Sequence, residues 1–391
     1  MPTLLETRLA ESRARGLYPY NLPLTRTGPA RATLDGREYV VASSYDYLSL
    51  IGHPRIDQAA REAVARHGTA TGGVRLLTGT TPEHLALEAH LAALYGTEDC
   101  VTFSSGYFAN IGAMAAVGSR RTLAYVDALS HRSVIDACVL AGAPMQRFRH
   151  NDAAHLRELL RTRPAGRRAV VFVESVYSMD GDLAPVAEIA RVAADEGATL
   201  LMDDAHGLGV LDAPGGAGGG HFGVAPGTVK AWVGSLSKAV PSSGGFVATD
   251  AATADRVRHV AGPYIFSAAA TPASVAAAGC ALEVMAREPW RREQLRENVR
   301  VFAAGLDRPF AGHPPESPIL PIHYPDDGAA LAAAAFLRGR GVLATPIVAP
   351  AVGASRPRLR VCINAAHSAD DLAALADGIN RFDRTLPRPP C

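Results

Sequence analysis

One side chain whose type and position could do chemistry is the amine of Lys238, which follows the apolar run AWVGSL in a chain whose positive charge is mostly arginine. A lysine usually lies on a solvated surface. A buried lysine amine, in contrast, can form an imine with a carbonyl compound. The residues next to Lys238 leave both interpretations open, so other parts of the sequence must decide between them.

Further polar side chains follow other apolar runs. Asp203 ends the run ATLLMDD, and His206 comes three residues later. A carboxylate at the end of a buried strand costs desolvation energy unless it meets a positive partner. Together with Lys238, the polar residues and glycine that follow these runs are Gly106, Tyr107, Ser130, His131, Glu174, Tyr177, Ser178, Asp203, His206, Ser235 and Ser237.

This set of residue types fits one cofactor, pyridoxal 5'-phosphate. The lysine would form the Schiff base, a carboxylate would face the pyridine nitrogen, and a histidine would stack on the ring. A helix N-terminus after Gly106 would bind the phosphate. Each residue alone has an ordinary explanation: Lys238 a surface lysine, Asp203 a helix N-cap, His131 a core or capping histidine, and Ser104–Gly106 a turn. Only their joint occurrence favours the cofactor.

The elements around these residues alternate. Strand-like apolar runs such as RTLAYVD and RRAVVFVES are followed by helix-like segments such as SHRSVIDACVLAG. Continuous apolar strands favour a mostly parallel α/β sheet that is buried on both faces, and such sheets bind ligands at the carboxyl ends of their strands. We expect an N-terminal segment over residues 1–45, a large cofactor-binding domain over 46–275, and a smaller C-terminal α+β domain over 276–385.

Composition excludes several classes of protein. The chain is 48% hydrophobic and 20% charged, with a formal net charge of +1, as in a globular protein with a large core. No long basic block supports nucleic-acid binding, and no run of about 18 apolar residues predicts a membrane span. The first residues lack the apolar core of a signal peptide. Five scattered cysteines indicate free thiols in a reducing compartment, so we expect a cytoplasmic protein. No metal site is expected.

Several motifs resemble one family along nearly the whole chain. SSYDYLSLIGHPRI, TFSSGYFANIGA, ESVYSMDGDLAP, LLMDDAHGLGVL, SLSKAVPSSGGFVA and PRLRVCINAAH occur in the order found in the α-oxoamine synthases. These are fold-type I pyridoxal-phosphate enzymes that include 8-amino-7-oxononanoate synthase and serine palmitoyltransferase. The resemblance implies an aminotransferase-like large domain with a mostly parallel seven-stranded sheet, and a homodimer with shared active sites.

The resemblance also implies a role for each position. Lys238 would anchor the cofactor and remove the α-proton of the amino acid. Asp203 would keep the pyridine nitrogen protonated, while His206 and Ser178 would bind the ring hydroxyl. His131 would stack on the ring and help to hold the acyl carbonyl. Phosphate binding falls to Gly106, Tyr107, Ser235 and Ser237, and substrate binding to Arg360 and Tyr45.

The implied reaction is the decarboxylative condensation of a small L-amino acid with an acyl thioester, either of CoA or of a carrier protein. Some positions depart from the family pattern. Tyr45 replaces the asparagine of 8-amino-7-oxononanoate synthases, and Val74 replaces a hydroxyl residue. Pro241 stands where glycine is usual, and Ala268 where a phosphate-binding threonine from the partner subunit is common. The amino acid, the acyl chain and the pathway therefore stay open.

Two alternatives remain from the sequence. The first is a fold-type I enzyme without acyl transfer, such as an aldolase-type lyase or an aminotransferase, which would use the same lysine and aspartate. The second is a non-enzymatic subunit that keeps the fold. The presence of Lys238, Asp203, His206 and His131 weighs against the second alternative.

Overall fold

The chain folds into two compact units. The computed structural model describes residues 4–14, 18–211, 219–308, 315–353 and 356–386. We call the part formed by Leu50–Ser178 and Asp182–Pro289 the sheet unit, and the part formed by Met1–Ser49, Met179–Gly181 and Trp290–Cys391 the terminal unit. Each unit is described by itself.

These boundaries differ from the expected domain limits at residues 45 and 275. Helix α10 (Pro272–Arg287) packs against α2 (Pro54–His67) and β10 (Pro241–Thr249), so the sheet unit continues past residue 275. Strand β12 (Val342–Leu343) pairs in parallel with β3 (Arg37–Val41), which joins the N-terminal segment to the C-terminal part of the chain. Neither pairing involves neighbours in the sequence.

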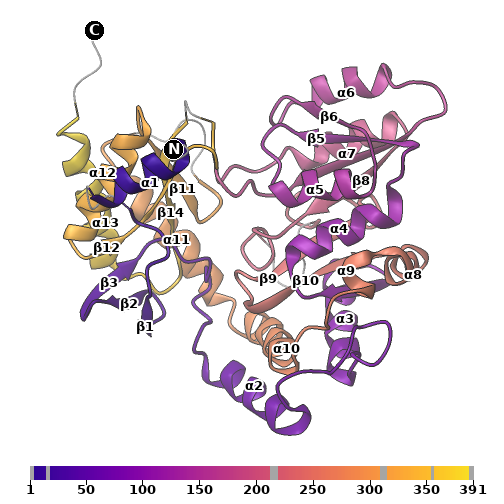
Figure 1. Cartoon of the computed structure of the whole chain (residues 1–391), viewed down its shortest axis with the longest axis horizontal. Coiled ribbons are helices and arrows are strands. Elements are labelled where there is room, and N and C mark those ends of the chain that lie inside the picture. Colours follow the sequence, from indigo (N-terminus) through magenta and orange to yellow (C-terminus); the bar gives the residue numbers. More distant parts are fainter. Residues whose placement is uncertain (1–3, 15–17, 212–218, 309–314, 354–355, 387–391) are drawn as a thin grey trace. The chain divides into compact units, whose positions relative to one another are not determined.

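The core of the sheet unit is a seven-stranded sheet in the order β4-β10-β9-β8-β7-β5-β6 (Figure 1). Only β10 runs antiparallel to its neighbours β4 and β9, so the sheet is mostly parallel, which confirms the predicted fold class. The central strands are buried along almost their whole length, as their continuous apolar sequences indicate. The strands besides β10 are β4 (Asp99–Phe103), β5 (Thr122–Asp127), β6 (Met145–Phe148), β7 (Arg168–Glu174), β8 (Ala198–Asp203) and β9 (Ala231–Ser237).

Helices follow most of these strands and cover the sheet. Helix α4 (Gly106–Val117) packs on β9, β10 and α5 (Arg132–Leu140), and its apolar residues join a buried cluster with the strand interiors. Helix α7 (Val186–Asp195) packs on β8 and on α6 (Ala153–Arg161). This packing aligns the N-terminus of α4 with the carboxyl ends of the parallel strands. The unit also contains α3 (Pro82–Tyr95), α8 (Ala251–Val260) and α9 (Gly262–Ile265).

The terminal unit contains two smaller sheets. One has the order β1-β2-β3-β12 and the other the order β11-β14-β13. Helix α12 packs on β12, β13 and β14, helix α13 packs on α11 and α12, and α1 lies near the N-terminus of the chain (Figure 1). The remaining elements are α1 (Leu4–Ala14), β1 (Thr25–Gly28), β2 (Arg31–Leu34), α11 (Trp290–Ala304), β11 (Ile319–His323), α12 (Asp327–Gly339), β13 (Thr345–Ile347), β14 (Arg358–Cys362) and α13 (Ala369–Asp383).

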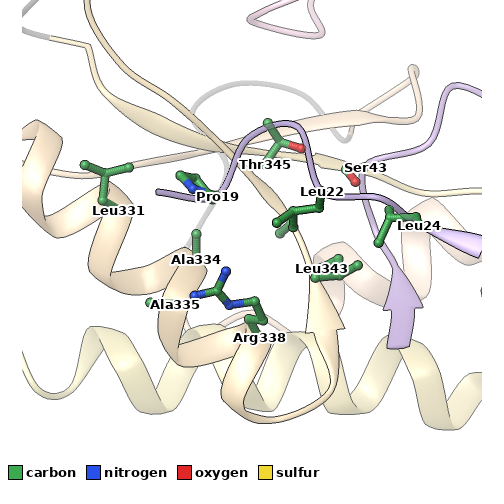
Figure 2. Close-up of a pocket in the computed structure, with 11 residues that line it drawn as sticks. Pro19, Leu22, Leu24, Ser43, Leu331, Ala334, Ala335, Arg338, Leu343 and Thr345 are labelled. Carbon is green, nitrogen blue, oxygen red and sulfur yellow. The ribbon is translucent and has the colours of Figure 1, made fainter. Parts of the chain in front are cut away.

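A pocket of about 150 Å³ opens in the terminal unit (Figure 2). Its wall is mainly apolar, with the guanidinium of Arg338 as its charged group, and no predicted site residue lines it. The lining residues are Pro19, Leu22, Leu24, Ser43, Leu331, Ala334, Ala335, Arg338, Leu343, Ala344 and Thr345.

Two expectations from composition can be compared with the described residues. None of the helices described is long and apolar enough to cross a membrane. In the same part of the chain Cys100, Cys138, Cys280 and Cys362 are free thiols, while Cys391 lies outside the described residues.

Candidate active site

The N-terminus of α4 meets the end of β9 at very short range. Ser105 caps the helix, because its Oγ accepts a hydrogen bond from Phe108 N at 3.2 Å. A Cβ on Gly106 would lie 3.1 Å from Ser235 Cβ, and a Cβ on Gly245 would lie 2.5 Å from Gly106 Cα. The glycines therefore allow the free N–H groups of the helix to approach the strand end. Since Ser235 Oγ lies 2.8 Å from Ser237 Oγ, hydroxyl groups and helix N–H groups collect at one place, as a phosphate requires.

The carboxylate of Asp203 lies at the end of β8, almost fully buried. Its Oδ2 accepts a hydrogen bond from Asn110 Nδ2 at 2.6 Å, and its Oδ1 accepts one from Ala205 N at 3.0 Å. Each oxygen of this buried carboxylate therefore accepts a hydrogen bond. Asn110 was missed from the sequence, although a polar residue in the apolar helix GYFANIGAMAAV was a usable signal.

His131 caps helix α5 with its side chain. Its Nδ1 accepts a hydrogen bond from Ser133 N at 3.2 Å and lies 2.7 Å from Ser133 Oγ. Its backbone N–H donates to Glu174 Oε1, at the end of β7. The capping interpretation of His131 is therefore correct, but it does not exclude a second role because the residue as a whole is exposed.

Lys238 directly follows β9 and is half-buried. Its positive charge acts on the buried carboxyl of Glu174 and lowers the pKa of that group. Burial, and next the charge of Asp203, have the larger effect and raise the pKa of Glu174 well above its usual range. Lys238 is therefore half-buried at the carboxyl end of β9, rather than exposed on the surface as an ordinary solvated lysine would be.

A second buried acid supports the turn that carries His206. Asp204 Oδ1 accepts a hydrogen bond from Ser175 Oγ at 2.5 Å, and its Oδ2 accepts one from Tyr95 Oη at 2.8 Å. Burial raises the pKa of Asp204 to about 7. A Cβ on Gly207 would lie 2.0 Å from Asp204 Oδ1, so only glycine fits the turn there. His206 itself is buried.

Ser178 is also buried, and the segment around it is held by a histidine between two acids. His150 Nδ1 lies 2.8 Å from Asp127 Oδ1, and its Nε2 lies 2.7 Å from Asp182 Oδ2. The ring also makes an edge-on contact with Tyr177, at 4.6 Å between centroids. His150 was not predicted as a site residue; it contacts Asp182, the last residue of the SMDGD motif, and Tyr177, which directly precedes the motif.

Tyr107 behaves differently from the other phosphate candidates. Its hydroxyl donates a hydrogen bond to Asp136 Oδ2 on α5, and 38% of the residue is exposed. Its backbone N–H lies at the start of α4, and the role of this group as a phosphate donor stays a prediction.

The two predicted substrate-binding residues lie together in the terminal unit. Arg360 Nη2 donates a hydrogen bond to Tyr45 Oη, and its guanidinium carbon lies 4.7 Å from the centre of the Tyr45 ring. Arg360 is 5% exposed and its neighbour Arg358 1% exposed, so neither is a surface arginine. Arg358 pairs with Asp180 Oδ1 at 2.8 Å, which leaves Arg360 as the candidate for a carboxylate ligand.

The sheet unit thus holds a helix N-terminus, two serine hydroxyls, a buried carboxylate, a capping histidine and a half-buried lysine at the carboxyl ends of its strands. This set of donors fits pyridoxal 5'-phosphate. Residues 37–379 match the family described as aminotransferase class I and II. The 8-amino-7-oxononanoate synthase of Alkalilimnicola ehrlichii is 40% identical over 380 residues, which cover 97% of each chain.

Other similar proteins agree. The 8-amino-7-oxononanoate synthase of Halorhodospira halophila is 39% identical over 388 residues, covering 98% of this chain and 96% of that protein. A solved structure of serine palmitoyltransferase from S. paucimobilis has a TM-score of 0.93 at 29% identity, covering 98% of this chain and 99% of that one. The chain belongs to the α-oxoamine synthase family.

This α-oxoamine synthase is a pyridoxal 5'-phosphate-dependent acyltransferase of the decarboxylative condensation type. The expected family, cofactor and enzyme class are confirmed. The relatives named above are all acyl-transferring enzymes, so they give no support to an aminotransferase or a lyase. The roles of the individual residues stay predictions.

Proposed function

We propose that this α-oxoamine synthase joins a small L-amino acid to the acyl group of a thioester and releases carbon dioxide and the free thiol. The product is an α-amino ketone. The observation that carries the proposal is the position of Asp203 on β8 and Ser235 on the adjacent strand β9, beside the N-terminus of α4, with Lys238 directly after β9.

Pyridoxal 5'-phosphate supplies an electron sink for the carbanion at the α-carbon of the amino acid. Lys238 Nζ is the proposed covalent attachment point and the base that takes the α-proton. Asp203 would face the pyridine nitrogen and hold a proton there, which favours electron acceptance by the ring. His206 and Ser178 bind the ring hydroxyl in this proposal.

The phosphate is proposed to bind the N–H groups of Gly106 and Tyr107 together with the hydroxyls of Ser235 and Ser237. His131 would stack on the ring and donate a hydrogen bond to the acyl carbonyl oxygen, where negative charge would develop as the thioester is attacked.

Arg360 and Tyr45 are the proposed ligands of the amino acid's carboxylate. A guanidinium offers two parallel N–H donors to a carboxylate, and the ring of Tyr45 limits the directions in which that guanidinium can point. The acyl donor is a thioester of CoA or of an acyl-carrier protein.

The proposed assembly is a cytoplasmic homodimer with shared active sites. Sedimentation equilibrium of the cofactor-loaded protein tests the dimer: a mass twice that of the 40.9 kDa chain is expected, and a monomer at micromolar concentration would contradict it.

A matrix of substrates tests the reaction. Glycine, alanine and serine would each be mixed with acyl-CoA and acyl-carrier thioesters of several chain lengths, and the products followed by mass spectrometry with assays for carbon dioxide and free thiol. Equal amounts of amino ketone, carbon dioxide and thiol are expected from at least one pair. Transfer of the amino group to a keto acid, without thiol release, would contradict the proposal.

A further inference from the structure

A buried chain of hydrogen bonds connects His131 to Asp203 through two residues that were not predicted as part of the site. His131 Nδ1 lies 2.7 Å from Ser133 Oγ, and Ser133 Oγ lies 2.8 Å from Asn110 Nδ2. The same Nδ2 lies 2.6 Å from Asp203 Oδ2. Asn110 is 2% exposed and Ser133 is 1% exposed, so water does not compete for these bonds.

The direction of every proton in this chain follows from one bond. The backbone N–H of Ser133 points at His131 Nδ1 at 3.2 Å, and a backbone N–H can only donate. Nδ1 is therefore an acceptor without a proton. A neutral imidazole carries its single proton on the other nitrogen, so the proton of His131 lies on Nε2.

The next two bonds follow from the first. Because Nδ1 accepts, the hydroxyl proton of Ser133 points to Nδ1, and the oxygen of this hydroxyl accepts from Asn110. The second N–H of the Asn110 amide then donates to the Asp203 carboxylate. The reverse orientation of the amide would place Asn110 Oδ1 against a carboxylate oxygen, which repels it.

The unused oxygen of Asn110 supports this orientation. Asn110 Oδ1 is buried and has no hydrogen-bond partner among the residues that the structure describes. A buried acceptor without a partner is unfavourable, so the bonds to Ser133 and Asp203 must hold the amide in place. An amide kept at this cost by two site residues indicates a functional constraint.

We propose that Asn110 and Ser133 are positioning residues that hold His131 as an Nε2–H donor and Asp203 as a hydrogen-bond acceptor. This inference rests on the proposed function, in which His131 donates to the acyl carbonyl oxygen and Asp203 accepts from the pyridine nitrogen. One amide fixes both groups at once, because it lies on helix α4 between α5 and β8. These hydrogen bonds thereby link Asp203, the proposed acceptor from the pyridine nitrogen, to His131, the proposed donor to the acyl carbonyl oxygen.

The tautomer of His131 can be measured directly. Nitrogen-15 NMR of the cofactor-loaded protein, labelled at histidine, distinguishes protonated from unprotonated ring nitrogens, and the signals of His131 are assigned by their loss in His131→Gln. We expect Nε2 protonated and Nδ1 unprotonated at neutral pH. A proton on Nδ1 would overturn the proposal whether or not the protein is active.

Kinetics of two variants test the positioning role. Ser133→Ala and Asn110→Ala should each lower kcat/KM for the acyl thioester by roughly 10-fold to 100-fold, less than the loss of an oxyanion donor itself. The KM for the amino acid should change less than about 3-fold, because the carboxylate ligands are untouched. In Ser133→Ala the His131 signals should also broaden or shift as the ring loses its hydroxyl partner.

Two controls separate positioning from stability. Asn298→Ala removes a buried amide in the terminal unit that donates to Asn364 O at 2.9 Å. Thr122→Val removes a buried hydroxyl at the first residue of β5, whereas the proposed site lies at the carboxyl ends of the strands. Both controls should lose stability but keep kcat/KM. If the wild-type enzyme performs the condensation but Asn110→Ala and Ser133→Ala lose no more activity than these controls, the inference is overturned and the proposed function stands. An inactive wild-type enzyme would instead refute the proposed function.

Discussion

Glu174 and Asp203 lie directly opposite each other in the parallel pairing of β7 and β8, so two carboxyl groups share one edge of the sheet. Burial and the charge of Asp203 raise the pKa of Glu174 well above its usual range. Two neighbouring acids in a buried place do not both ionise. The raised pKa therefore favours the protonated form of Glu174.

Glu174→Gln tests this assignment. A glutamine has nearly the shape of a protonated glutamate, and its oxygen can still accept from His131 N. We expect the dissociation constant for pyridoxal phosphate, measured by spectral titration, and kcat/KM to change less than about 3-fold. If kcat/KM fell more than about 30-fold while thermal stability was unchanged, Glu174 would have to be ionised in the wild-type enzyme.

Arg75→Met should unfold the protein much more easily. Arg75 forms two parallel hydrogen bonds with Glu88, at 2.8 and 3.1 Å, and both side chains are about 4% exposed. Removing one partner leaves a buried carboxylate without its counter-charge, which costs about 3–5 kcal/mol. Urea denaturation checks the value. Arg66→Met, which removes an exposed ion pair with Glu83, is the control and should cost less than about 1 kcal/mol. Equal losses in the free energy of unfolding for the two variants would contradict a stabilising role of the buried Arg75–Glu88 pair.

Stability should fall as pH rises through the range controlled by His150. Burial lowers the pKa of His150, but the hydrogen bonds and charges of Asp127 and Asp182 outweigh this effect and raise it to about 9. A raised pKa means that the stabilisation is complete below about pH 6.5, the unfolded value, and is lost as pH rises through about 9. Within this window the free energy of unfolding should decrease by up to about 1.4 kcal/mol per pH unit.

The variant His150→Gln isolates this effect. Its free energy of unfolding, measured from pH 6 to 10, should depend less on pH than that of the wild type. Subtracting the free energy of unfolding of the variant from that of the wild type at each pH cancels the contribution of Asp204, whose pKa of about 7 lies in the same range. Parallel curves would mean that His150 is not protonated between its two acids.

Arg360→Lys should weaken binding of the amino acid. A lysine keeps the positive charge but cannot make two parallel hydrogen bonds to a carboxylate. We expect the KM for the amino acid to rise roughly 10-fold to 100-fold and the KM for the thioester to stay constant. Tyr45→Phe keeps the ring near the guanidinium and removes the hydroxyl acceptor, so its effect should be smaller than 10-fold. An unchanged KM for the amino acid in both variants would remove Arg360 from the substrate site.

The central strands of the fold could be predicted because they are continuous apolar runs. The runs RTLAYVD, RRAVVFVES, ATLLMDDA and AWVGSL correspond to β5, β7, β8 and β9. Strand β10 was not expected, because it follows the Lys238 turn through SSGG, which reads as a loop. The N-terminal strands β1–β3 were also missed, since they are short and partly exposed and one of them pairs with β12 near the other end of the chain.

The site was predictable to a similar extent. Residues at strand ends were found, because parallel strands present them at one edge. Asn110 and Ser133 were missed because they lie inside or at the start of helices, where only three-dimensional packing brings them to Asp203 and His131. Glu174 was noted at a strand end, but its protonation depends on the register that places it opposite Asp203.

The most direct test of the whole account is to locate the covalent bond to the cofactor. The enzyme loaded with pyridoxal phosphate would be reduced with borohydride, digested and analysed by peptide mass spectrometry, beside Lys238→Ala and the control Lys230→Ala. Lys230 pairs with Asp250 at 2.6 Å, outside the proposed site. We predict a phosphopyridoxyl group on Lys238 in the wild type and in Lys230→Ala, and none in Lys238→Ala. A label on Lys230, or no label on Lys238, would contradict the account.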